Sequence, residues 1–233
     1  MSKRIFQSFP CLIFVGVNMP MFAGQAHPNG PENRPFVERT IRIQDKAQDC
    51  VFSLAYPKPD DIVDWAPKGL YNAADPYPTP LTLVYQYRGY FWQGVFGGVT
   101  LELKINSRKP DQPKWEGLES LLEGVRIQRI AHNKVTKNNP PESRQEWMEP
   151  VLSQLNGVQC VQQYVYKGSN PKGEWHYYFP LGDDHAVELI MWLVDNSNRP
   201  GLTKSDWQPR AEAFANRLLS TVRIRMEAKP TQK

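Results

Sequence analysis

The sequence predicts an α+β protein in which helices pack on antiparallel sheets, and three observations favour that class. Several short segments alternate apolar and polar side chains as half-buried strands do, most clearly residues 99–105. Residues 211–222 carry an apolar stripe at helical spacing, and an alternating segment follows at once. The order strand, loop, tryptophan, helix, strand also occurs twice, with tryptophans at Trp115 and Trp207. We therefore expect two related strand-strand-Trp-helix-strand units.

Residues 175–194 predict a hairpin. Trp175 to Phe179 is rich in aromatic side chains, which suit a half-buried pleated surface. Pro180 to His185 contains turn-forming residues. Ala186 to Val194 is apolar on both faces, apart from Glu188. Such a strand is typical of the centre of a sheet that is covered on both sides.

A helix is expected next, with Ser205 or Asp206 as its N-terminal cap. Its apolar stripe consists of Ala211, Phe214, Ala215, Leu218, Leu219 and Val222. From Val222 to Met226 the period changes to two, which predicts a final strand with one exposed face. The closing segment is thus predicted to be a helix laid across an antiparallel sheet.

The remaining chain predicts two units, at 36–136 and 137–228, with a tail at 229–233. Strands are expected at 37–43, 50–56, 81–87, 90–96, 99–105, 125–130 and 158–166, and short helices at 115–125 and 147–155. The pattern Leu-Leu-x-x-Val-Arg-Ile occurs at 121–127 and again at 218–224, which favours two related units over a chance match.

The first 26 residues resemble a secretory signal peptide. Lys3 and Arg4 precede a mostly apolar stretch at 5–22, and Gly24 and Ala26 supply the small residues before a cleavage site. A buried helix is the alternative, but prolines interrupt it, and the stretch is too broken for a membrane span. We expect export to the periplasm, no stable membrane insertion after cleavage, and a polar linker at 27–35.

Charge and cysteine content narrow the function further. The chain has 28 basic and 24 acidic residues, so its net charge is small. Its sequence also contains no dense cluster of lysine and arginine that would indicate nucleic-acid binding. Cleavage of the signal removes Cys11 and leaves Cys50 and Cys160. A pair of cysteines in an oxidising compartment predicts a disulfide, and two buried free thiols are the alternative.

Residues 57–80 form an unusual proline-rich segment in which aromatic side chains stand among carboxylates. Loops of this length are uncommon in compact domains and are often functional. The segment could insert into a partner's pocket or fold back on the body as a lid. The candidate partner-binding residues are Asp60, Asp61, Trp65, Tyr71, Asp75 and Tyr77.

The sequence contains no motif that requires catalysis. Nucleophile-elbow, zinc-protease, phosphate-loop and Cys-x-x-Cys patterns are absent, and the histidines have no metal-ligand spacing. Asp183, Asp184 and His185 could hold a metal or a general base, but a hairpin turn already explains these residue types. We expect His176 to pack on its strand with a hydrogen-bonded ring. No catalytic residue, metal site or cofactor is therefore predicted.

The closing unit resembles PsbP-like α/β/α modules. The resemblance rests on a Phe-Pro-Leu-x-x-x-His turn at 179–185, an apolar strand ending in Asp195, Trp207 before a helix, and the Leu-Leu-x-x-Val-Arg-Ile ending. It covers residues 158–226 well and 81–130 loosely. Among exported bacterial proteins, the chain is similar to periplasmic immunity proteins of type VI secretion effectors, including two-module proteins that neutralise phospholipase effectors.

This resemblance implies a non-enzymatic periplasmic protein that binds a cognate toxin and blocks its active site. It transfers no toxin-contacting residue to this chain. An envelope module that binds a small ligand or an assembly partner in a groove between the two units is the alternative. A hydrolase using Asp184 and His185 is the second alternative. The sequence leaves the oligomeric state open.

Overall fold

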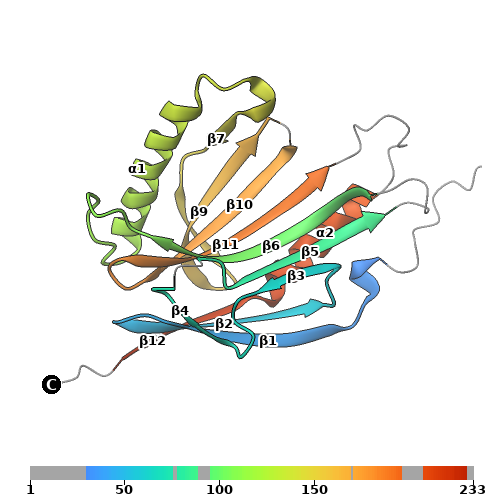
Figure 1. Cartoon of the computed structure of the whole chain (residues 1–233), viewed down its shortest axis with the longest axis horizontal. Coiled ribbons are helices and arrows are strands. Elements are labelled where there is room, and N and C mark those ends of the chain that lie inside the picture. The colour runs from blue at the N-terminus through green and yellow to red at the C-terminus, as the bar shows by residue number, and fades with distance from the viewer. Residues whose placement is uncertain (1–29, 76–77, 89–94, 169, 196–206, 230–233) are drawn as a thin grey trace, which may run out of the picture.

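The computed structural model describes residues 30–75, 78–88, 95–168, 170–195 and 207–229. The predicted signal peptide, Tyr77 and the expected helix cap at Ser205 or Asp206 lie outside these residues. The described chain forms a large sheet, a small sheet and two longer helices (Figure 1). It therefore belongs to the predicted class of helices packed on antiparallel sheets.

The large sheet has eight strands in the order β3-β5-β6-β11-β10-β9-β7, with β8 also paired to β9. Every pairing in it is antiparallel. Its strands are β3 (Asp61–Asp64), β5 (Leu81–Arg88), β6 (Val95–Ser107), β7 (Gln145–Trp147), β8 (Val151–Leu155), β9 (Val158–Lys167), β10 (Asn170–Leu181) and β11 (His185–Asp195). As predicted, the doubly apolar strand β11 lies inside the sheet, between β6 and β10.

The small sheet has four strands in the order β12-β2-β1-β4. Its strands are β1 (Phe36–Gln44), β2 (Gln48–Pro57), β4 (Leu70–Asn72) and β12 (Arg223–Ala228). The pair β1–β4 is parallel, whereas β1–β2 and β2–β12 are antiparallel. The last strand of the chain is therefore paired with the second.

The helices α1 (Leu118–Thr136) and α2 (Trp207–Thr221) cover opposite faces of the large sheet. Helix α2 and the small sheet enclose the main core, to which Phe52, Tyr85 and Phe214 contribute fully buried rings. Helix α1 covers a second, smaller core around Trp115 and Tyr178. Figure 1 shows α1 over the β9–β10 end of the sheet and the small sheet below it. No helix in the described part of the chain is long and apolar enough to span a membrane.

The predicted helical stripe of α2 is confirmed. Ala211, Phe214 and Leu218 are at most 1% exposed. The helix ends where Thr221 hydrogen-bonds the backbone of Ala55 on β2 through its hydroxyl. Pairing with β2 then takes over, and the chain continues as β12, as the change of period predicted.

The two-unit repeat is not confirmed. The matching Leu-Leu-x-x-Val-Arg-Ile segments differ in structure: 121–127 is helical throughout, whereas 218–224 crosses from α2 into β12. Strands from the two halves also interleave, because β6 pairs with β11 and β2 with β12. The strand expected at 125–130 is part of α1, since Leu121, Leu122 and Val125 share one buried helical face.

The helix expected at 147–155 does not form: these residues contain the end of β7 and all of β8, and both strands pair with β9. Pro150 lies between β7 and β8, and Asn156 and Gly157 form a two-residue turn with φ of 51° and 84°. Positive φ at both positions suits a hairpin of right-handed twist, and Asn-Gly is the favoured sequence for it. The Asn-Gly turn therefore favours a β-hairpin here, although the apolar residues also fit helical spacing.

The predicted disulfide is not formed in the structure. Cys50 on β2 and Cys160 on β9 are free, and both are 0% exposed. Their strands belong to different sheets, β2 to the small sheet and β9 to the large one. The alternative of two buried thiols is the one observed.

The described part of the predicted linker at 27–35 is docked on the fold. The short 3-10 helix η1 (Pro31–Asn33) places Glu32 against Arg210 on α2, and Arg34 lies 3.0 Å from Asp60. A second 3-10 helix, η2 (Pro141–Ser143), precedes β7. The N-terminal stretch thus ties α2 to the start of the proline-rich segment.

Candidate functional site

The proline-rich segment is ordered by both sheets rather than being structureless. Its first part forms β3 on the edge of the large sheet, and its second part forms β4 on the edge of the small sheet. Between them, the backbone N–H of Trp65 donates to the Pro80 carbonyl at 3.0 Å, and that of Gly69 donates to Ala66 at 2.8 Å. The segment therefore joins the two sheets along one side of the molecule.

Two of its carboxylates hold the segment in place. Asp60 accepts hydrogen bonds from Arg34 at 3.0 Å and from the Gln86 backbone at 2.7 Å. Asp64 is paired with Arg39 of β1. Burial alone would lower the pKa of Arg39, but hydrogen bonds to Asp64 and Tyr56 raise it above its usual value. Asp60 and Asp64 are thus paired with arginines of the same chain, so the segment is less acidic than its sequence indicates.

Tyr71 belongs to the core, contrary to its assignment as a partner-binding residue. It is 4% exposed, and its hydroxyl is buried without a hydrogen-bond partner among the described residues. Burial and the nearby Asp75 charge raise the pKa of its phenol to about 12. Its position follows from the parallel pairing of Tyr71 with Ile43, a long-range contact that the local sequence does not predict.

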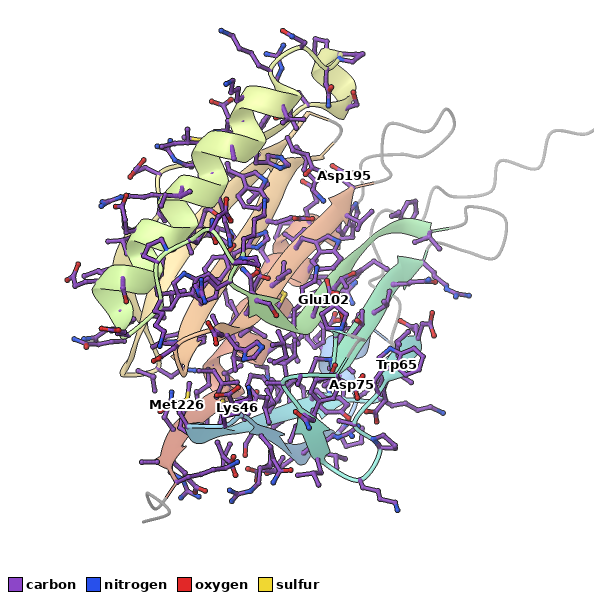
Figure 2. The ribbon with its side chains drawn as sticks, turned by 60° about the vertical axis from the view of Figure 1, so that its left-hand side comes forward. Lys46, Trp65, Asp75, Glu102, Asp195 and Met226 are labelled. Atoms are coloured by element: carbon purple, nitrogen blue, oxygen red, sulfur yellow. The ribbon has the colours of Figure 1, made fainter. Side chains whose placement is uncertain are left out.

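The exposed side chains of the segment include one tryptophan and three aliphatic residues among charged and polar ones. Trp65 is 51% exposed, Leu70 52%, and Ile62 and Val63 43% each. We call these four residues the Trp65 surface. Asp61 and Asp75 are exposed along the same segment, and Figure 2 shows Trp65 and Asp75 on the same side of the molecule. Four of the six predicted contact residues, Asp60, Asp61, Trp65 and Asp75, thus remain at or near the surface.

A second candidate site is a groove of about 440 Å³ between α2 and strands β9–β11. The Tyr164 and Trp175 rings form one side, with centroids 4.8 Å apart, and Ala215 and Leu219 of α2 border the other. Glu212 and Asn216 add polar groups from the helix. No local sequence signal predicts this groove, because it depends on where α2 crosses the sheet. Trp175, assigned to a strand interior, is 42% exposed here.

The groove also differs from the ligand-binding cleft that was predicted between the two expected units. Every residue lining this groove comes from positions 164–219. It is an aromatic and aliphatic surface with a polar rim, the usual composition of a small-molecule site.

His176 lies in a buried polar network under α1, as its predicted hydrogen-bonded ring requires. Its Nδ1 is 2.7 Å from Glu188 and its Nε2 3.3 Å from Glu174, and Lys167 pairs with Glu174. Burial lowers the pKa of His176, but hydrogen bonds to the two carboxylates outweigh it and raise the pKa. The network is 6–8% exposed at His176, Glu174 and Glu188, so it is closed to a substrate in this structure.

The turn residues Asp183, Asp184 and His185 are each held by a partner. Arg108 donates to Asp184 at 2.6 and 2.9 Å, Lys114 to Asp183 at 3.1 Å, and His185 Nδ1 lies 2.8 Å from Asp45. The hydrogen bond from Arg108 lowers the pKa of Asp184. These contacts attach residues 108–115 to the β10–β11 turn, which is a structural role. Among the described residues, no group of three or more histidine, cysteine, aspartate or glutamate side chains could hold a metal.

Comparison with known proteins identifies no relative: no family model matches the chain, and no curated protein matches its sequence.

Proposed function

We propose that the chain is an exported, non-enzymatic binding protein that recognises a protein partner through the Trp65 surface. Its most specific form is an immunity protein that blocks a secreted toxin's active site. The observation that carries the proposal is a half-exposed tryptophan in a segment that also exposes the aliphatic side chains of Ile62, Val63 and Leu70. Tryptophan is enriched among residues that dominate binding energy, especially where neighbouring contacts exclude water.

The anchoring of this surface supports the same function. Trp65 is fixed by its backbone bond to Pro80, and the adjacent Asp64 is paired with Arg39 of the other sheet. A surface that is already ordered loses little conformational freedom on binding, so more of the contact energy contributes to affinity. The partner expected here presents an apolar pocket.

The test is affinity capture of the exported protein from its own cells, followed by mass spectrometry. We expect one stoichiometric protein that is toxic when it is produced alone in the periplasm and harmless when the two are produced together. Trp65→Ala should reduce both capture and protection, whereas Trp175→Ala, which changes a second exposed tryptophan on a different surface, should preserve both. Capture and protection by the Trp65 variant at wild-type levels would refute the assignment.

The groove beside α2 favours a second function, the binding of a small aromatic or amphipathic molecule. The Tyr164–Trp175 pair offers a stacking surface, and Glu212 and Asn216 offer polar contacts. Screening by thermal shift should then find a compound that raises the melting temperature in a saturable way. Trp175→Ala should remove that shift and Trp65→Ala should not, which separates the two functions.

A further inference from the structure

The edge strands of the large sheet, β7, β3 and β8, differ in how their outward-facing backbone groups are protected from pairing with another chain. Strand β7 is covered by α1: Asn133 exchanges two hydrogen bonds with the backbone of Trp147, at 2.8 and 2.9 Å, and Thr136 donates to the Gln145 carbonyl at 2.9 Å. These side chains occupy backbone groups that would otherwise accept another strand. Such protection is common, because an open edge is a template for pairing with another chain.

Strand β3, at the opposite edge, is protected by its own carboxylate. The Ile62 N–H points away from β5 and donates to the Asp61 side chain at 2.8 Å. Asp61 and Asp64 also place charge at both ends of this four-residue strand. Charge and short length both discourage edge-to-edge pairing.

Strand β8 has neither form of protection. Its sequence, Val-Leu-Ser-Gln-Leu, contains no charge and no proline. Val151 is 51% exposed on the α2 face and Leu152 47% on the α1 face, as their pairings with Gln162 and Val161 require. An uncharged edge strand with exposed aliphatic side chains on both faces is a predicted pairing site.

The hairpin register shows which backbone groups of β8 face outward. A two-residue loop closes on the pair Leu155–Val158, which exchanges hydrogen bonds, so Ser153 and Val151 also bond to β9. Leu152 and Gln154 therefore direct their N–H and C=O groups away from the sheet. Neither backbone has a hydrogen bond to another described residue on that side.

We propose that β8 pairs with β8 of a second copy of this chain, antiparallel, about a two-fold axis at Ser153. In this register Leu152 faces the partner's Gln154 and Gln154 faces the partner's Leu152, so each pair exchanges two hydrogen bonds. The N–H and C=O groups of Leu152 and Gln154 are then all hydrogen-bonded to the second copy. Because the two copies are related by a two-fold axis, the edge is self-complementary. The two large sheets become one continuous sheet.

The surroundings of β8 are compatible with a second copy. Glu149, the nearest carboxylate before the strand, is paired with Arg126 at 2.8 Å and Arg129 at 2.5 Å, and Arg126 also lies 3.6 Å from Glu123, so these two arginines and two carboxylates balance in charge. Ile130, on the flank of α1 between Arg126 and Asn133, is 60% exposed beside the same edge. Because a five-residue strand pair buries less than a standard interface, we expect a dimer that dissociates at low concentration.

The proposal is tested by cross-linking on the full chain with Cys11 replaced by serine and with Cys160, which lies opposite Ser153 on β9, replaced by alanine. In this register the two Ser153 residues form a non-hydrogen-bonded pair with Cα atoms about 4.5 Å apart, which suits a disulfide. Ser153→Cys should therefore cross-link on mild oxidation. Gln154→Cys should not, because its counterpart lies two residues further along the partner strand, beyond about 7 Å.

Sedimentation over a range of concentrations gives the independent measurement. The unmodified chain should rise from the monomer mass toward twice that mass, Leu152→Lys should stay monomeric, and Ile62→Lys on the protected edge should behave as the unmodified chain. The proposal is overturned if the chain stays monomeric and Ser153→Cys does not cross-link. Equal cross-linking of both cysteine variants would overturn it too, as would capture of a different protein by β8 while the chain remains monomeric.

Discussion

His176 and Glu188 form the closer of the two histidine–carboxylate contacts in the buried network under α1, with Nδ1 and Oε1 2.7 Å apart. His176 lies on β10 and Glu188 on the neighbouring strand β11. Both are almost fully buried, so the imidazolium and carboxylate must compensate each other's desolvation. Stability should therefore depend on pH through this network.

The first prediction concerns that dependence. The pKa of His176 is raised, so its contribution is present below its ordinary value of 6.5 and is lost as pH rises through the folded-state pKa. Burial tends to raise the pKa of Glu174, but hydrogen bonds to His176 and Lys167 lower it, so its contribution is present above 4.5 and is lost as pH falls through the lowered pKa. Urea unfolding should show the network's largest contribution between these values. His176→Gln should weaken the decline on the alkaline side, and an unchanged pH profile in this variant would contradict the account.

The second prediction concerns Gly124 in α1. An alanine there would gain about 1 kcal/mol of helix propensity, but its Cβ would collide with the buried Trp115 indole. Gly124→Ala should therefore destabilise the protein by about 1–3 kcal/mol in chemical denaturation. In a Trp115→Ala background the same substitution should cost much less or stabilise. Equal effects in the two backgrounds would show that the contact does not matter.

Much of this fold is predictable from local pattern, for reasons visible in its elements. The strands β1, β2, β5, β9, β10 and β11 alternate or are continuously apolar, and the α2 stripe meets a core on one face only. The hairpin β8–β9 was missed because its apolar residues also fit helical spacing, and the Asn156-Gly157 turn decides between the two. The proposed repeat failed because the same short pattern can lie inside a helix or at its end.

The candidate site was predictable in composition but not in detail. Trp65 is half-exposed, as the partner-binding alternative requires, yet Tyr71, in the same segment, is buried in the core because β4 pairs with β1. The ion pairs of Asp60 and Asp64 depend on arginines more than 20 residues earlier in the chain. The groove beside α2 also arises from packing between distant elements. Long-range contacts of this kind leave no local signal.

The third prediction separates Tyr71 from Trp65. Tyr71→Ala should destabilise the protein by about 3–5 kcal/mol, because it removes a buried aromatic ring from the core. Tyr71→Phe should be neutral or stabilising, since the buried hydroxyl lacks a hydrogen-bond partner among the described residues. Trp65→Ala should cost clearly less than Tyr71→Ala, because about half of the Trp65 side chain is already exposed. Thermal and urea unfolding of the three variants measure this, and a large loss for Trp65→Ala would instead make it a structural residue.

The fourth prediction concerns the two buried thiols. Burial and the neighbouring Asp49 charge raise the pKa of Cys50 to about 12. Burial also raises the pKa of Cys160 to about 11, because its effect is larger than the opposite effect of a backbone hydrogen bond, which lowers the pKa. In a Cys11→Ser variant, a thiol reagent at pH 8 should label neither cysteine in the native protein and both after unfolding without reductant. Failure of the unfolded, unreduced protein to react would reveal a disulfide.

The most direct test of the central claim is the affinity of the captured partner for the Trp65 and Trp175 variants, measured by calorimetry. If the Trp65 surface is the recognition site, Trp65→Ala should weaken binding by about 2 kcal/mol or more, roughly 30-fold, while Trp175→Ala stays within experimental error of the unmodified protein. Both variants should unfold at nearly the temperature of the unmodified chain. Unchanged affinity for Trp65→Ala would contradict the account. A loss of affinity confined to Trp175→Ala would in addition place recognition in the groove beside α2.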